Sequence, residues 1–235
     1  MSDSNCKTIQ EINKNVKWAE WSHYQRPLSQ RAIHAKVLRI LRRKHPGKLL
    51  EIGACNDLLL KECQKMGWDV VGLDLSENTS ELIVQHDATE PLPFPEKFDC
   101  IVALEVIEHL VDTDTFLENM ADGLKPGGVL ILSTPNLLFW INRLLMFFGQ
   151  KPKICYEDYH VRMFVWKDLK QRLEKRFAIL KVFGSHVLVG PWYANWAKIF
   201  SWLGDYLPTI SAHFIVVAQK QPETHSIHST DKALS

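Results

Sequence analysis

The sequence predicts an α/β fold, a doubly wound and mostly parallel sheet with helices on both faces. From residue 48 to residue 133, short apolar runs of strand length alternate with segments of helical periodicity. The first apolar run, KLLEI, is followed directly by a glycine, and the second ends in an acidic residue. This order indicates a βαβ unit that presents a ligand site at the carboxyl ends of its strands.

The first βαβ unit (48–76) has the spacing of a nucleoside-binding unit. Gly53 stands at the sharp turn from strand to helix, where the lack of a Cβ lets a ligand approach the backbone. Residues 58–66 follow at helical spacing, and the strand 70–73 leads into Asp74. Asp74 follows Gly53 by roughly 20 residues, the distance at which such a unit offers a carboxylate to ribose hydroxyls.

The rest of the chain continues the alternation. An aromatic helix at 16–24 is expected to place Trp18, Trp21 and Tyr24 on one face, as a cover either for the core or for a bound cofactor or substrate. Periodicity and turn residues predict the other elements. We expect helices at 28–44, 112–124, 136–149 and 165–176, and strands at 81–85, 100–104, 129–133, 177–183 and 212–218.

The bulk composition is that of an ordinary globular protein. The chain has 235 residues, 46% hydrophobic and 23% charged, and a net charge of +1 that argues against a nucleic-acid partner. Five scattered cysteines favour reduced thiols over a disulfide framework. The N-terminus is too polar for a signal peptide, and no apolar run is long enough for a transmembrane segment. We expect a cytoplasmic protein that is able to touch a membrane as a peripheral contact.

Four motifs in order resemble the class I S-adenosylmethionine-dependent methyltransferases, with the quinone and cell-envelope O-methyltransferases as the nearest branch. They are EIG, LDLS, HDATEPLPFPEKFDCIVALEVIEHL and LKPGGVLILSTPN, between residues 48 and 136. The resemblance implies an enzyme with a Rossmann-like seven-stranded sheet, an antiparallel last strand and a helical substrate cap. The length predicts one domain over 1–235, with N-terminal helices (1–44), a cofactor-binding core (45–136), and substrate-side helices with the remaining core (137–210). The tail (219–235) lacks apolar periodicity and is expected to be flexible.

The resemblance also implies the cofactor, S-adenosylmethionine, and the residues that bind it. Asp87 is expected to accept a hydrogen bond from the adenine amino group, and Glu105 to border the sulfonium. Arg31 matches an arginine that related quinone O-methyltransferases use for the cofactor carboxylate. Cys55 and Asp57 replace two glycines of the family's loop and crowd its methionine end. The full expected set is Arg31, Glu51, Gly53, Ala54, Cys55, Asp74, Leu75, Asp87, Ala88, Leu104 and Glu105.

A group of acidic and histidine residues is a candidate metal site. In a helical turn, Glu105, Glu108 and His109 point one way and can hold a divalent cation such as magnesium. A similar group binds a metal in small-RNA 2′-O-methyltransferases and in ubiquinone-biosynthesis O-methyltransferases, and His160 resembles the downstream histidine of both families. In the alternative, the glutamates only cap and brace the helix. His109 and His160 are also the candidate catalytic bases, because histidine titrates near neutral pH.

Two apolar segments bear on the substrate. Residues 136–149 are almost entirely apolar, and residues 192–207 are rich in aromatic residues. They indicate either a hydrophobic substrate and a membrane surface, or a helical cap that buries both segments against each other.

The function expected first is O-methylation of a small hydrophobic, lipid-linked or glycan acceptor. One alternative is a metal-dependent RNA 2′-O-methyltransferase, which the charge balance disfavours. The other alternative is a non-catalytic methyltransferase-like binding module, and cofactor binding separates that module from both enzymes.

Overall fold

The computed structural model describes residues 32–77, 80–156, 160–187 and 202–222. Several expectations therefore lie outside the described residues. They are the aromatic helix at 16–24, Arg31, the first ten residues of the segment 192–207, and the tail from residue 223.

Seven strands form one sheet in the order β3-β2-β1-β4-β5-β7-β6. The strands are β1 (Lys48–Ile52), β2 (Asp69–Asp74), β3 (Ile83–Gln85), β4 (Phe98–Leu104), β5 (Leu124–Pro135), β6 (Phe177–Gly184) and β7 (His213–Lys220). β1 to β5 pair in parallel, whereas β7 runs antiparallel to both β5 and β6. The predicted seven-stranded, mostly parallel sheet with an antiparallel finish is confirmed.

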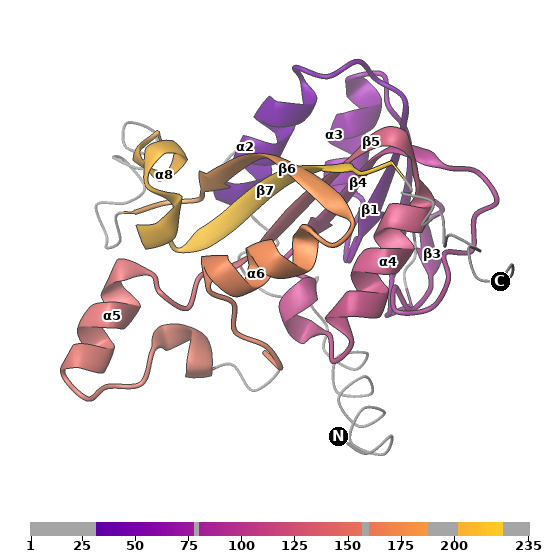
Figure 1. Cartoon of the computed structure of the whole chain (residues 1–235). Helices are drawn as coiled ribbons and strands as arrows, with labels where there is room; N and C mark the ends of the chain where they lie inside the picture. The colour runs from indigo at the N-terminus through magenta and orange to yellow at the C-terminus, as the bar shows by residue number, and fades with distance from the viewer. Residues whose placement is uncertain (1–31, 78–79, 157–159, 188–201, 223–235) are drawn as a thin grey trace, which may run out of the picture.

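Helices cover both faces of this sheet (Figure 1). The α-helices are α2 (Ala32–Leu41), α3 (Leu58–Lys65), α4 (Thr113–Gly123), α5 (Trp140–Phe147), α6 (Trp166–Leu173) and α8 (Leu203–Tyr206), and the short 3₁₀ helices are η3 (Ile107–His109), η4 (Lys153–Tyr156) and η5 (Pro208–Ile210). α2 and α3 lie on one face, and α4 and α6 lie on the other.

The central strands are largely apolar because both of their faces are buried. Along β4, Cys100 and Val102 belong to the core under α2 and α3, whereas Ile101 and Ala103 belong to the core under α4 and α6. A strand between two helical layers favours apolar side chains on both faces, which explains the near-continuous apolar runs in the sequence.

Local chemistry sets two element boundaries. Asp112 caps α4, since its carboxylate accepts a hydrogen bond of 3.0 Å from the Thr115 N–H. The residues 125–128 lie within β5 as an irregularity in the pairing, because Phe98 pairs with Leu124 and Cys100 pairs with Val129. β5 is therefore longer than the predicted strand 129–133.

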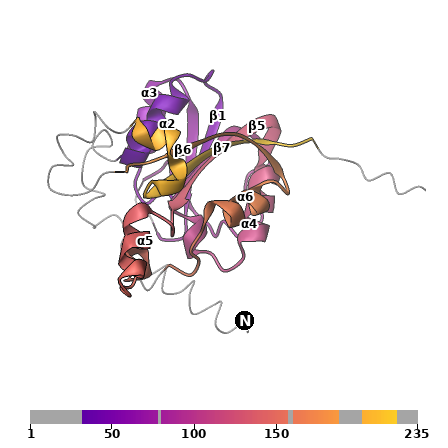
Figure 2. The ribbon, with the colours of Figure 1, turned by 60° about the vertical axis from the view of Figure 1, so that its left-hand side comes forward.

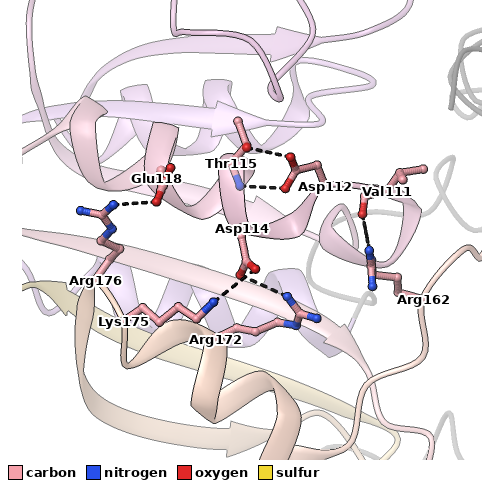
Figure 3. A network of polar contacts seen from close by, with 9 residues as sticks. All are labelled: Val111, Asp112, Asp114, Thr115, Glu118, Arg162, Arg172, Lys175 and Arg176. Atoms are coloured by element: carbon pink, nitrogen blue, oxygen red, sulfur yellow. Dashed lines mark hydrogen bonds and ion pairs between the residues drawn. The ribbon is translucent and has the colours of Figure 1, made fainter. Parts of the chain in front are cut away.

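Ion pairs join α4 to the end of α6 at the surface (Figure 3). Asp114 lies 3.1 Å from Arg172 and 3.2 Å from Lys175, and Glu118 lies 2.6 Å from Arg176. These groups are largely exposed, and such pairs stabilise by only ~0.2–1 kcal/mol each. They connect the two helices at the surface, and their contribution to stability is small.

α5 is an apolar helix at the surface, set apart from the sheet (Figure 2). Asn142 is its buried residue, whereas Phe147 is 82% exposed and the adjoining Phe148 is 66% exposed. The alternative of a cap that buries 136–149 against 192–207 stays a prediction, because residues 192–201 lie outside the described residues. None of the described helices has the length and apolarity needed to cross a membrane.

Candidate functional site

The loops that follow β1, β2 and β4 meet at the carboxyl edge of the sheet. β1 lies between β2 and β4, so the strand order reverses here, and open α/β sheets bind ligands at such a reversal. The N–H groups of Gly53 and Ala54 both donate to the Leu73 carbonyl, over 2.8 and 3.0 Å. Gly53 has φ 72°, and a Cβ on it would lie 2.6 Å from Cγ2 of Val106. Glycine is required here by conformation and by space.

Asp74 offers a buried carboxylate at this edge. Its Oδ1 accepts a hydrogen bond of 2.8 Å from the Ser76 N–H. Burial raises the pKa of Asp74 and outweighs the lowering effect of that bond. Further donors, such as ribose hydroxyls, would stabilise the charged form. The predicted contact with ribose hydroxyls would therefore supply the hydrogen-bond donors that stabilise the charged Asp74 carboxylate.

The expected adenine contacts lie on the loop after β3. Asp87 Oδ1 accepts hydrogen bonds from the N–H and the hydroxyl of Thr89, over 2.9 and 2.7 Å. Ala88 is buried, and its carbonyl accepts from the Asn119 side chain over 3.2 Å. This loop is therefore held in place before any ligand binds.

The other expected cofactor residues occupy different environments. Leu75 is half-buried, and its carbonyl accepts from Gln85 Nε2 over 3.1 Å. Leu104 is buried at the end of β4. Glu51 lies inside β1 and is buried, and its charge adds to the burial that raises the pKa of Cys63 to about 12. Glu51 thus sits within the sheet, beneath the loop.

Cys55 and Asp57, which replace two glycines of the family's loop, crowd the site less than the sequence suggests. Asp57 accepts a hydrogen bond of 2.8 Å from Ser80 Oγ and pairs with Lys61 at 2.9 Å. The hydrogen bond from Lys61 is the main cause that lowers the pKa of Asp57. The Asp57 carboxylate is therefore engaged by the protein itself. Cys55 remains half-buried in the loop, with the Asn56 amide 3.6 Å from its sulfur.

Glu108, His109 and His160 form a cluster with metal-ligand chemistry. One ligand atom from each lies within 4.8 Å of the other two, and the two imidazole rings are 5.1 Å apart. Backbone hydrogen bonds explain this proximity, because the N–H groups of Val161 and Arg162 both donate to the Glu108 carbonyl, over 3.0 and 2.9 Å.

Arg162 reinforces this arrangement. Its guanidinium donates to the carbonyls of Leu110 and Val111, just beyond η3, and Figure 3 shows the contact with Val111. The segment that carries His160 is thereby fastened to the segment that carries Glu108.

Two further hydrogen bonds orient the ligand atoms. Thr134 Oγ1 donates to Glu108 Oε2 over 2.9 Å. His160 Nδ1 lies 3.2 Å from the Ile154 carbonyl, which can only accept, so this nitrogen carries a proton. In the neutral ring the lone pair is then on Nε2, the state that serves a metal ligand or a base. The donor set therefore fits a divalent cation.

Glu105 does not join this cluster. The predicted helical turn from residue 105 is wrong, because η3 begins at Ile107 and Glu105 has φ 57°. Glu105 Oε1 instead accepts a hydrogen bond of 2.6 Å from Ser133 Oγ, and Oε2 lies 3.3 Å from His213 Nε2. Helical spacing does not apply to a residue in the left-handed conformation just after a strand.

The sequence patterns did not point to the groups around Glu105, which are Ser133, Ser185, His186 and His213. One signal could have revealed His213. A strand antiparallel to β5 begins at the edge where β5 ends, so its first residue lies near the loops of the parallel strands. Ser185 Oγ lies 2.9 Å from His213 Nδ1 and joins the same network.

Comparison with known proteins shows the family of this chain. The model of a methyltransferase domain family matches residues 21–177. The chain belongs to this family. It is a class I S-adenosylmethionine-dependent methyltransferase, which confirms the predicted family, enzyme class and cofactor.

Curated relatives of this methyltransferase include ubiquinone biosynthesis O-methyltransferases. That of Chelativorans sp. (strain BNC1) is 35% identical over 102 residues, which cover 38% of this chain and 40% of the relative. The human mitochondrial protein is 28% identical over 127 residues, which cover 44% of this chain and 34% of the relative. The similarity thus spans well under half the length of these relatives.

Solved structures share the fold of this methyltransferase. The N-methyltransferase NodS from Bradyrhizobium japonicum WM9, in complex with S-adenosyl-L-homocysteine, has a TM-score of 0.58 and 15% identity, over 94% of this chain and 100% of NodS. A putative methyltransferase in complex with the Haloferax volcanii Trm112 activator has a TM-score of 0.61 and 12% identity, over 83% of this chain and 91% of that one.

Proposed function

We propose that this methyltransferase methylates an oxygen of a small hydrophobic, lipid-linked or glycan acceptor. One observation carries the proposal: Glu108, His109 and His160 come together directly after the β4 loop, which contacts the glycine of the cofactor loop. An acid–base or metal-binding group is thereby set beside the edge where the cofactor is expected. The curated relatives named as ubiquinone biosynthesis O-methyltransferases support an oxygen acceptor.

S-adenosylmethionine supplies an electrophilic methyl group on its sulfonium. The protein must align the acceptor oxygen with that methyl and receive the acceptor's proton. His160 is suited to receive it, since its Nδ1 donates to the Ile154 carbonyl and Nε2 then carries the lone pair. His109 lies beside it and is the second candidate base.

The same residues suit a divalent cation. Glu108, His109 and His160 would hold it, and the Thr134 hydroxyl already orients the Glu108 carboxylate. A bound cation would acidify and orient an acceptor hydroxyl. Glu105, which was expected among the ligands together with these three residues, lies outside this group.

The test combines cofactor binding with turnover. Calorimetric titration with S-adenosylhomocysteine, with and without magnesium, should show binding by the wild type. His109→Ala and His160→Ala should bind it nearly as well, yet lose methyl transfer to quinol and lipid-linked glycan acceptors. Full turnover in either variant would remove that histidine from the mechanism. Turnover unaffected by a chelator would remove the metal.

We also propose that α5 makes a peripheral contact with lipid, which brings the enzyme to a hydrophobic acceptor. Besides Phe147 and Phe148, this helix leaves Leu144 48% and Met146 40% exposed. Every charged residue between 136 and 156 is basic. An exposed apolar helix with basic neighbours suits the surface of an anionic bilayer.

Vesicle sedimentation tests this contact. The double variant Phe147→Ser, Phe148→Ser should bind anionic vesicles at least tenfold more weakly than the wild type. Leu180→Ser is the matched control, because Leu180 is 53% exposed but lies on β6, outside α5. Equal binding by all three proteins would exclude α5 as the contact.

A further inference from the structure

A series of contacts joins two histidines and a serine to Glu105 at the carboxyl edge of the sheet. Ser185 Oγ lies 2.9 Å from His213 Nδ1 and 3.1 Å from His186 Nδ1. At the other end of the series, His213 Nε2 lies 3.3 Å from Oε2 of Glu105. Ser185 is buried, so its hydroxyl depends on these protein partners for its hydrogen bonds. Four side chains that can carry a proton therefore lie in contact, one after another.

The topology of the sheet explains why these side chains meet. β6 runs in the same direction as β5, because β7 lies between them and is antiparallel to both. Ser185 and His186 directly follow β6, and His213 begins β7. All three therefore lie at the edge where Glu105 follows β4. Open α/β sheets bind their ligands at this edge.

His186 connects the series to α5. Its ring lies 6.1 Å from the ring of Phe139, which directly precedes α5. Trp140, the first residue of α5, donates from Nε1 to the Val187 carbonyl over 2.6 Å, and this bond holds the segment after β6 against the helix. The half-buried His186 thus lies between the edge of the sheet and the helix proposed to bring the enzyme to a hydrophobic acceptor.

The partners of these groups assign their protons. A carboxylate only accepts, so neutral His213 carries its proton on Nε2, and its Nδ1 accepts from the Ser185 hydroxyl. The Ser185 oxygen then accepts from His186 Nδ1, which leaves the lone pair of His186 on Nε2. When His213 carries a second proton, on Nδ1, both bonds of Ser185 reverse and the proton of His186 is on Nε2. The protonation of His213 therefore sets the tautomer of His186.

Charge favours His213 over His186 as the ring that holds an added proton. Burial is the main cause that lowers the pKa of His186 to about 4, and the charges of His213 and Lys36 are smaller causes. His213 instead faces the Glu105 carboxylate, and an opposite charge nearby stabilises an imidazolium. A proton that arrives at His186 is therefore more stable after it has passed to His213.

We propose that these four side chains form a proton relay that removes the acceptor's proton during methyl transfer. The inference rests on the proposed function. The acceptor oxygen gives its proton to His186 Nε2 and forms the bond to the methyl carbon, while the carbon–sulfur bond breaks and the sulfonium becomes a thioether. The Nδ1 proton of His186 passes to Ser185, and the Ser185 hydroxyl proton passes to His213 Nδ1. The resulting imidazolium pairs with Glu105, and after the product leaves, the reverse steps return the proton to water.

This relay gives the acceptor's proton a destination outside the metal-ligand cluster. Glu108, His109 and His160 suit a divalent cation, and a cation held there uses the lone pairs of both imidazoles. A base is then needed elsewhere, and His186 supplies it. His186 is thus the catalytic residue of the relay, whereas Ser185, His213 and Glu105 act through it.

The variant Ser185→Ala separates the relay from a structural role. Its kcat for quinol and lipid-linked glycan acceptors should fall about 100-fold, while KM for the acceptor and affinity for S-adenosylhomocysteine stay within about threefold of the wild type. Ser211→Ala is the matched control and should keep kcat. Ser211 is also a buried serine at this edge, but its hydroxyl donates to the Leu207 carbonyl over 3.0 Å.

Nitrogen NMR of the wild type, labelled at histidine, tests the relay without an acceptor. At neutral pH the proton of His186 should be on Nδ1. As acid protonates His213, the proton of His186 should move to Nε2 at the same pH. A histidine that only packs against its neighbours keeps one tautomer through this titration. His186→Gln and His213→Gln assign the two sets of signals.

The outcomes are distinct. An equal effect of Ser185→Ala and Ser211→Ala on kcat would overturn the relay while leaving the proposed function intact. So would a His186 proton that stays on the same nitrogen while His213 titrates. A wild type that methylates none of these acceptors would overturn the proposed function and, with it, the relay.

Discussion

Acidification should destabilise this methyltransferase partly through His186, and His186→Gln should remove that part. Burial is the main cause that lowers the pKa of His186 from 6.5 to about 4, and the charges of His213 and Lys36 add to it. Lys36 is close, because its ammonium donates to the Gly184 carbonyl over 2.6 Å. The folded protein thus keeps His186 neutral at pH values where the unfolded chain protonates it.

The direction and the size of the change in the free energy of unfolding follow from proton linkage. Below pH 6.5 the His186 imidazole is protonated in the unfolded chain, whereas in the folded protein it stays neutral down to about pH 4. The free energy of unfolding therefore falls as the pH falls through this range. From pH 7 to pH 5, these two pKa values give a loss of about 2 kcal/mol. The ring is partly exposed, and solvent screening reduces the expected loss to about 1–2 kcal/mol.

Urea denaturation at pH 7 and at pH 5 measures this contribution. Other groups titrate in the same range, so the informative quantity is the difference between wild type and variant. His186→Gln should lose about 1–2 kcal/mol less than the wild type between the two pH values. His45→Gln is the control, because His45 is exposed beyond α2. If His186→Gln and the wild type lose equal stability, the linkage argument for His186 is refuted.

Three further predictions concern packing, capping and metal binding. Gly72→Ala puts a Cβ 2.7 Å from the Ala54 Cβ, and the overpacking should cost about 1–3 kcal/mol in urea denaturation; an unchanged midpoint would contradict it. Asp112→Ala removes the cap of α4 and should cost about 1 kcal/mol, whereas Asp112→Asn should retain most of it. Thr134→Val removes the donor to Glu108 and should weaken manganese binding about 10–100-fold in calorimetry, and unchanged affinity would show that this hydroxyl does not tune the site.

The order of helices and strands was predictable because buried strands appear in the sequence as runs of apolar residues. A strand covered on both faces is apolar at nearly every position, and the run at 100–104 shows this directly. The run at 48–52 follows the rule at Leu49, Leu50 and Ile52, and Glu51 is its buried exception. Boundaries were harder to predict. The glycine-rich residues 125–128 predict a turn, yet Leu124 before them pairs with Phe98, and a pairing across the sheet leaves no local signal.

The candidate site was predictable where it depends on neighbours in sequence. Glu108 and His109 are adjacent, and the resemblance supplied His160. Glu105 was misplaced, since its left-handed conformation depends on contacts with Ser133 that spacing cannot reveal. His213 was missed because it reaches the site only through the reversed direction of β7.

The place of β7 in the sheet has a consequence for the newly made chain. β7 follows β5 and β6 in sequence but lies between them in space. As a ribosome releases the chain, the edge of β5 stays unpaired until residues 213–220 emerge, and such an open edge invites association with other chains. His213 arrives with the same strand. Closing the sheet and bringing His213 to Glu105 are therefore a single late event in the protein's synthesis.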